Sequence, residues 1–290
     1  MKIKTKILFG IFLSVFFAVL SVIKVYGADN ASTLNDTQII KEIQKCNKKI
    51  DKHPEKTKLY IKRGFLKFCL GDFKSALEDY VEAEKFEPYN SDIFYSRGRV
   101  WYAKKNYEEA IKDFDKAVEL NKKDSKIYIS RGIVKDKLGD YEGALSDYDT
   151  AIKYDRRSRS AYSNRGVVKD KLKDYDGALD DYNHSLKLCK YAPDTYYNMA
   201  LTKCKLENYD DAVNDFTKAI EQNPKYCMAY YQRGLAYLKL DRKQYAKSDL
   251  KKALALNPSN KEIKEALHIL NKELNELYNT KIPDWILNDD

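Results

Sequence analysis

A unit of 34 residues occurs six times in succession in this sequence, with no insertion or gap between copies. Each copy has an aromatic residue at its fourth place and small residues at its eighth, twentieth and twenty-seventh places. One such unit cannot bury its apolar side alone, so a core must form by stacking neighbouring units. The copies span residues 57–90, 91–124, 125–158, 159–192, 193–226 and 227–260.

Each copy is expected to be a pair of antiparallel helices. Apolar residues recur at spacings of three and four in two runs per copy, which is the helical period. A short turn such as Leu138–Tyr141 separates the runs, and a proline such as Pro88 ends the second helix. Glycine at place eight, as at Gly132, would let the two backbones approach closely. The pattern therefore predicts an all-α fold.

These motifs resemble those of the tetratricopeptide repeat (TPR) family. The matching segments include Tyr60–Gly64, Asp72–Leu77 and Asp140–Leu145, and the resemblance extends over residues 57–260. It implies a right-handed α-solenoid of six helix–turn–helix repeats, in which the first helix of each repeat lines an inner groove. It also implies a protein that binds protein or peptide partners and is not an enzyme.

The N-terminus has the pattern of an export signal. Positive residues Lys2, Lys4 and Lys6 precede an uncharged, largely apolar run at 7–23, and Val25–Gly27 suits cleavage before Ala28. The 17-residue run is also at the short limit for crossing a bilayer, so an uncleaved anchor is the alternative. We therefore expect an exported bacterial protein with a signal peptide at 1–27, periplasmic or secreted, or tethered to the inner membrane through residues 7–23.

Helices are expected to close both ends of the repeat array. Residues 28–56 contain a linker and a capping helix that Asp36 or Thr37 could begin and that runs to about Asp51. Residues 261–280 place leucines at spacings of three and four between charged residues, which predicts a second capping helix. Residues 281–290 form a short tail that carries Trp285.

The composition indicates neither a metal site nor nucleic-acid binding. The net charge is +9, but four of the lysines lie in the first 27 residues, so the repeats themselves are only weakly basic. The 5 cysteines form no CxxC pair, and the 3 histidines are far apart in the sequence. No nucleotide-binding, protease or hydrolase motif occurs. We therefore expect no enzymatic activity and no cofactor.

Arginine recurs at the seventh place and aspartate at the twenty-third place of the repeats. In an antiparallel helix pair that turns near place fifteen, these two places lie level with each other. We interpret them as a structural ladder of ion pairs and not as an anion site, because their period is that of the fold itself. The arginines are Arg63, Arg97, Arg131, Arg165 and Arg233, and the aspartates are Asp79, Asp113, Asp147, Asp181, Asp215 and Asp249.

The inner groove implied by the resemblance would be apolar and aromatic, with some amides. Tyrosine and asparagine suit peptide binding, because they offer contact area and hydrogen bonds at a low entropic cost. The alternative is that some of these side chains belong to the core between repeats. The predicted groove residues are Phe65, Phe68, Tyr95, Arg99, Tyr102, Asn164, Tyr197, Asn198, Tyr231 and Gln232.

Lysine occupies the thirteenth place of four consecutive repeats, at Lys137, Lys171, Lys205 and Lys239. These lysines could form a basic rim that meets acidic residues of a partner, or simply a solvated edge. Together these patterns favour a non-catalytic scaffold of the cell envelope that binds a peptide segment of a partner. Two alternatives are a self-associating surface protein and a subunit that tethers an envelope enzyme or secretion complex.

Overall fold

The computed structural model describes residues 35–281, with side chains through residue 275. All regular secondary structure within this part of the chain is helical, which confirms the predicted fold class. The predicted signal peptide at 1–27 and the tail beyond residue 281 lie outside the described residues. Among the described helices, none is both long enough and apolar enough to cross a membrane.

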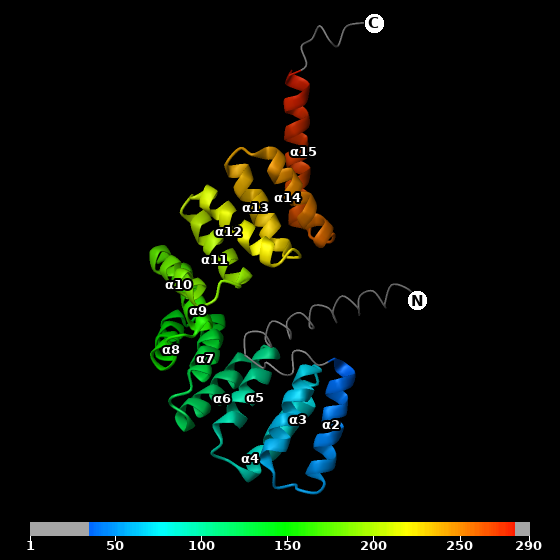
Figure 1. The fold of residues 1–290 in the computed structure, drawn as a ribbon, viewed down its shortest axis with the longest axis vertical. Helices are drawn as coiled ribbons and strands as arrows, with labels where there is room; N and C mark the ends of the chain where they lie inside the picture. The colour runs from blue at the N-terminus through cyan, green and yellow to red at the C-terminus, as the bar shows by residue number, and fades with distance from the viewer. Residues whose placement is uncertain (1–34, 282–290) are drawn as a thin grey trace, which may run out of the picture. The chain divides into compact units, whose positions relative to one another are not determined.

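The chain divides into two compact units, residues 1–164 and 165–290. Within each unit consecutive helices alternate in direction (Figure 1). The boundary between the units falls inside α9 (Arg159–Lys171). The N-terminal unit contains α2 (Asp36–Ile50), α3 (Thr57–Cys69), α4 (Phe73–Phe86), α5 (Ser91–Ala103), α6 (Tyr107–Leu120), α7 (Ser125–Leu138) and α8 (Tyr141–Tyr154). The C-terminal unit contains α10 (Tyr175–Leu188), α11 (Pro193–Lys205), α12 (Tyr209–Gln222), α13 (Cys227–Lys239), α14 (Lys243–Leu256) and α15 (Lys261–Lys281).

The turn inside each repeat has a fixed backbone geometry. Its fifteenth residue is in the left-handed region, where glycine is favoured because it has no Cβ. Gly71 and Gly139 occupy this place with φ of 77° and 83°. The other four repeats hold a residue with a side chain there: Lys105, Lys173, Glu207 and Asp241. The turn is therefore imposed by helix packing even where no glycine is available.

Side-chain caps begin most of the second helices. Asp140, for example, accepts a hydrogen bond at 2.9 Å from the amide of Gly143, which lacks a partner inside the helix. The first capping helix, α2, begins differently from the sequence prediction. Asn35, and not Asp36 or Thr37, caps α2 through a reciprocal pair of bonds with Gln38, because its side chain reaches the third amide of the helix.

The core of each repeat forms where its two helices approach most closely. Ala144 at place twenty is fully buried, and the ring of Tyr148 at place 24 is 1% exposed. A Cβ added to Gly132 would lie 2.8 Å from the Tyr148 ring. This geometry confirms the predicted close contact at place eight, since the ring occupies the volume that a larger residue would need.

Candidate interaction surface

The predicted ladder of ion pairs is present and mostly buried. Arg131 donates to both carboxylate oxygens of Asp147, at 2.9 Å from Nε and 2.6 Å from an Nη atom. Equivalent two-point pairs occur in every repeat that has the arginine, namely Arg63–Asp79, Arg97–Asp113, Arg165–Asp181 and Arg233–Asp249. Such a planar, two-point pair fixes the orientation of the guanidinium relative to the carboxylate.

The ladder also connects consecutive repeats. The remaining Nη atom of Arg131 donates at 2.7 Å to Asp115 of the preceding repeat, and that of Arg233 donates at 2.8 Å to Thr217. Burial alone would lower the pKa of Arg131, but the hydrogen bonds and charges of Asp147 and Asp115 raise it above its ordinary value. The guanidinium is therefore occupied by the fold, which supports the structural interpretation.

A second cation at place eleven was not anticipated from the sequence. Lys67, Lys135 and Lys169 each approach the ladder aspartate of their own repeat at 2.9–3.0 Å. In the fifth repeat Met199 replaces the arginine, and Lys203 donates to Asp215 at 2.6 Å instead. The recurrence of lysine at place eleven in four repeats was the sequence signal for this role.

Two of the predicted groove residues of the N-terminal unit, Phe68 and Arg99, lie in the interior, whereas Phe65, Tyr95 and Tyr102 are partly exposed. Phe68 is 1% exposed and Arg99 is 7% exposed, so the prediction that they line an open groove is wrong. The Arg99 guanidinium lies 5.6 Å from the ring centroids of Phe65 and Phe68 and 5.7 Å from that of Tyr95. Aromatic packing thus draws these side chains inward. The ring of Tyr102 packs on Tyr107 at 5.9 Å.

The equivalent side chains of the C-terminal unit remain partly exposed. Tyr197 packs its ring 4.9 Å from Tyr226 and keeps part of its surface open. Asn198 and Gln232 are partly exposed on the neighbouring helices α11 and α13. Tyr231 packs against the apolar side of α15. Asn164, which ends the N-terminal unit, is also partly exposed.

All four residues of the predicted basic rim are exposed. Lys205 forms an ion pair with Asp170, and Thr202 donates to the same carboxylate at 2.7 Å. Lys137 belongs to the N-terminal unit and the other three lysines to the C-terminal unit. A single stripe of four lysines therefore remains a prediction.

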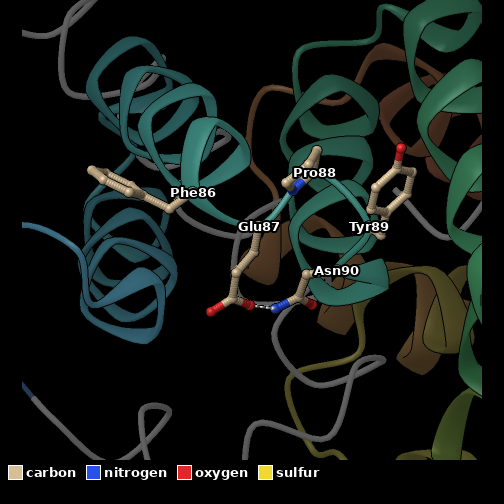
Figure 2. A pocket seen from close by; sticks show the side chains of 5 residues that line it. All are labelled: Phe86, Glu87, Pro88, Tyr89 and Asn90. Carbon is tan, nitrogen blue, oxygen red and sulfur yellow. Dashed lines mark hydrogen bonds between the residues drawn. The ribbon is translucent and has the colours of Figure 1, made fainter.

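Two further features of the described residues bear on chemistry. The connection between α4 and α5 forms an open depression lined by Phe86–Asn90, in which Asn90 donates to Glu87 at 2.6 Å (Figure 2). Phe86 and Tyr89 point away from each other there, and Tyr89 is 80% exposed. Residues 35–275 hold no group of histidines, cysteines and carboxylates that could bind a metal ion, and the 5 cysteines are free.

Models of the tetratricopeptide repeat match residues 91–124, 130–193, 193–226 and 228–260. The chain therefore belongs to the tetratricopeptide repeat family. The models do not cover residues 57–90, but α3 and α4 form the same helix pair there, with the same ion pair between Arg63 and Asp79. Proteins of this family are generally non-catalytic scaffolds that bind protein or peptide partners. No curated protein sequence matches this chain.

Solved structures share the fold at low sequence identity. The Cut9–Hcn1 hetero-tetramer of the APC/C is 18% identical with a TM-score of 0.71, over 80% of this chain and 46% of that one. This chain thus spans about half the length of that relative. PilW, a type IV pilus biogenesis factor, is 18% identical with a TM-score of 0.68, over 73% of this chain and 98% of PilW. YrrB, a TPR protein with a peptide-binding site, is 23% identical with a TM-score of 0.52, over 65% of this chain and 97% of YrrB.

Proposed function

We propose that this chain is a non-catalytic scaffold of the bacterial cell envelope that binds a peptide segment of a partner protein. The binding surface is the inner face of the C-terminal unit, on α11 and α13. The observation that carries this proposal is the partial exposure of Tyr197, Asn198, Leu201, Gln232 and Leu235 on that face. Apolar side chains beside amides can bury a peptide side chain and hydrogen-bond its backbone.

The basic rim suggests the chemistry of the partner. Lys171, Lys205 and Lys239 are exposed at the ends of α9, α11 and α13 in the C-terminal unit. Acidic residues beside an apolar segment of the partner would complement them, which speeds association and fixes orientation. Because Asp170 already pairs with Lys205, the attraction is weaker than the number of lysines suggests. Changing Lys137, Lys171, Lys205 and Lys239 to Glu should weaken partner binding and remove its salt dependence.

Site-specific cross-linking tests the surface. A photoreactive residue in place of Asn198 should cross-link one peptide segment of one partner in native envelopes. The matched control is the same substitution at Asn214, another asparagine, which is exposed on the second helix of the same repeat. Equal yields of the same product at both positions would contradict the proposed surface, and products from neither position would contradict the proposed function.

Export is a separate part of the proposal, because residues 1–27 lie outside the described structure. It is supported by the charged and apolar pattern of that segment. Sequencing of the native protein should find an N-terminus near Ala28. Recovery of Met1 in the membrane fraction would instead support a tether through residues 7–23.

A further inference from the structure

Helix α15 brings its own C-terminal end to one edge of the C-terminal unit. Glu262 and Glu265, at the start of α15, lie close enough to Tyr231 in the second turn of α13 to raise its pKa, adding to the effect of burial. Glu273 lies 3.4 Å from Lys243, the first residue of α14. Helix α15 therefore runs parallel to α13, and its C-terminal end points past the turn between α13 and α14 (Figure 1).

Helix α15 continues beyond that turn. Residues 274–281 add about 12 Å of helix at 1.5 Å per residue. The first helices of other repeats end at this level, as α11 does at Lys205 and α13 at Lys239. The chain therefore leaves α15 beyond the edge formed by the turns after α11 and α13.

This turn edge, defined as Lys205, Leu206, Tyr237, Lys239 and Tyr245, has apolar and basic surface. Leu206 is 44% exposed and Tyr245 is 64% exposed. Tyr245 stacks on Tyr237 with ring centroids 5.3 Å apart. Lys239 is exposed at the end of α13, and Lys205 is exposed at the end of α11, where it pairs with Asp170. The edge thus offers exposed aromatic and apolar surface together with positive charge.

The segment that follows α15 has complementary chemistry. Residues 282–290 contain Trp285, Ile286 and Leu287 in succession, with Asp284 before them and Asp289 and Asp290 after them. Trp285, Ile286 and Leu287 are the fourth to sixth residues after Lys281, so they reach about 13–20 Å from the end of α15. Helix α15 ends about 12 Å beyond the turn and neighbouring helices pack about 8–10 Å apart, so the end of α13 is within reach and the end of α11 is at the limit of the reach.

We propose that residues 282–290 dock onto the turn edge of their own molecule. Trp285 and the two apolar residues after it cover Leu206 and Tyr245, and the aspartates lie beside Lys239 and Lys205. Lys239 contributes most of the attraction, because Lys205 also pairs with Asp170. Docking within one molecule is favoured over a second copy, since a short connection to α15 gives an effective concentration in the millimolar range.

Docking would cover two lysines of the basic rim and so compete with an acidic partner. That consequence depends on the proposed function, whereas the docking itself does not. The test below therefore measures the position of the tail without any partner, and its outcome is independent of whether a peptide binds the inner face.

Tryptophan fluorescence provides the test, because the sequence has 2 tryptophans, Trp101 and Trp285. In a full-length Trp101→Phe chain, Trp285 should emit at shorter wavelength, and acrylamide should quench it several-fold less than it quenches a free 282–290 peptide. Replacing Leu206 and Tyr245 by Ser, or Lys205 and Lys239 by Glu, should restore peptide-like emission and quenching. Tyr89→Ser and Lys137→Glu, which alter exposed residues of the N-terminal unit, are the matched controls and should change neither.

Several outcomes would overturn the proposal. Peptide-like emission and quenching in the unaltered Trp101→Phe chain would show that the tail is not docked. Shielding that survives both pairs of substitutions would place Trp285 elsewhere. Shielding that increases with protein concentration, together with a larger sedimentation coefficient, would show that the tail docks on a second copy.

Discussion

The two units contain the same repeat but differ in how many of their inner-face side chains are buried. In the N-terminal unit Phe68, Arg99, Ile129 and Ser130 are buried at places five, six, nine or twelve of a first helix. In the C-terminal unit all residues at those places of α11 and α13 are partly exposed. Other residues at these places of the N-terminal unit, such as Phe65, Tyr95 and Tyr102, are partly exposed. The family signature is the same in both units, so it does not determine which inner-face side chains are buried.

The ladder differs between the units as well. In each repeat of the N-terminal unit an arginine donates hydrogen bonds to the ladder aspartate. The fifth repeat has Met199 in place of the arginine, and there Lys203 donates to Asp215. A lysine is a flexible point charge, and a guanidinium is a planar donor that reaches two carboxylates at once. The ladder thus connects consecutive repeats through Arg97, Arg131 and Arg233, whereas Met199 of the fifth repeat cannot donate such a hydrogen bond.

The largest expected effect comes from removing ladder aspartates. Asp147→Ala leaves Arg131 with Asp115 alone as its carboxylate partner and removes the carboxylate from Lys135. Both side chains are mostly buried, so the change should cost about 3–5 kcal/mol of unfolding free energy. Asp215→Ala should cost less, because Lys218 is half exposed and a lysine can extend toward solvent. Urea denaturation of both variants measures the difference. Equal losses of unfolding free energy in the two variants would show that an aspartate paired with arginine stabilises the fold no more than one paired with lysine.

Close packing at place eight gives the next comparison. Gly132→Leu should cost about 1–3 kcal/mol, because even its Cβ would lie 2.8 Å from the rigid Tyr148 ring. Gly234→Leu should cost less, since the nearest atoms belong to the flexible Leu250 side chain at 3.3 Å. Thermal melting of the two variants orders the effects. A larger loss of stability in Gly234→Leu than in Gly132→Leu would contradict the argument that the rigid Tyr148 ring makes the substitution costly.

The left-handed turn residues give a smaller, stabilising effect. Lys105→Gly should raise the unfolding free energy by a few tenths to about 1 kcal/mol, because relief of the left-handed penalty exceeds the added entropy of the unfolded chain. Asp241→Gly should gain less, since aspartate tolerates this conformation better than lysine does. Denaturation midpoints of both variants check the order, and destabilisation by Lys105→Gly would refute it.

The smallest effect is expected at the exposed start of the array. Hydrogen bonds from Lys45 and Lys62 lower the pKa of Glu42 to about 2 from its ordinary 4.5. The stabilisation from Glu42 is therefore complete above pH 4.5 and is lost as the pH falls toward 2. Glu42→Gln should flatten the stability curve in that window, by an amount that salt reduces.

The control for this titration is at the other end of the array. Glu273→Gln removes one ion pair, between α15 and Lys243 of α14, without touching the Lys62 contact. Stability from pH 5 to pH 2 is followed by circular dichroism in both variants. An unchanged curve in Glu42→Gln would show that the link between α2 and α3 carries no measurable free energy.

The ion-pair ladder could be predicted from the sequence, whereas the burial of the inner-face residues could not. Periodicity placed the ladder correctly, because places seven and 23 lie level in any antiparallel pair that turns at place fifteen. It failed at Phe68 and Arg99, because the burial of a side chain on the inner face depends on the residues that surround it in space. The aromatic residues around Arg99 come from α3 and α5, and the covering of Tyr231 comes from α15.

The sequence by itself determined the helix pairs, the stacking of repeats and the ion-pair ladder. These features follow from local period and from chemistry that recurs every 34 residues. The tertiary structure decided which inner-face side chains are buried, where the chain leaves α15, and how Asp215 is paired without an arginine. Those outcomes depend on contacts between side chains that are distant in sequence, and one repeat period is compatible with several such arrangements.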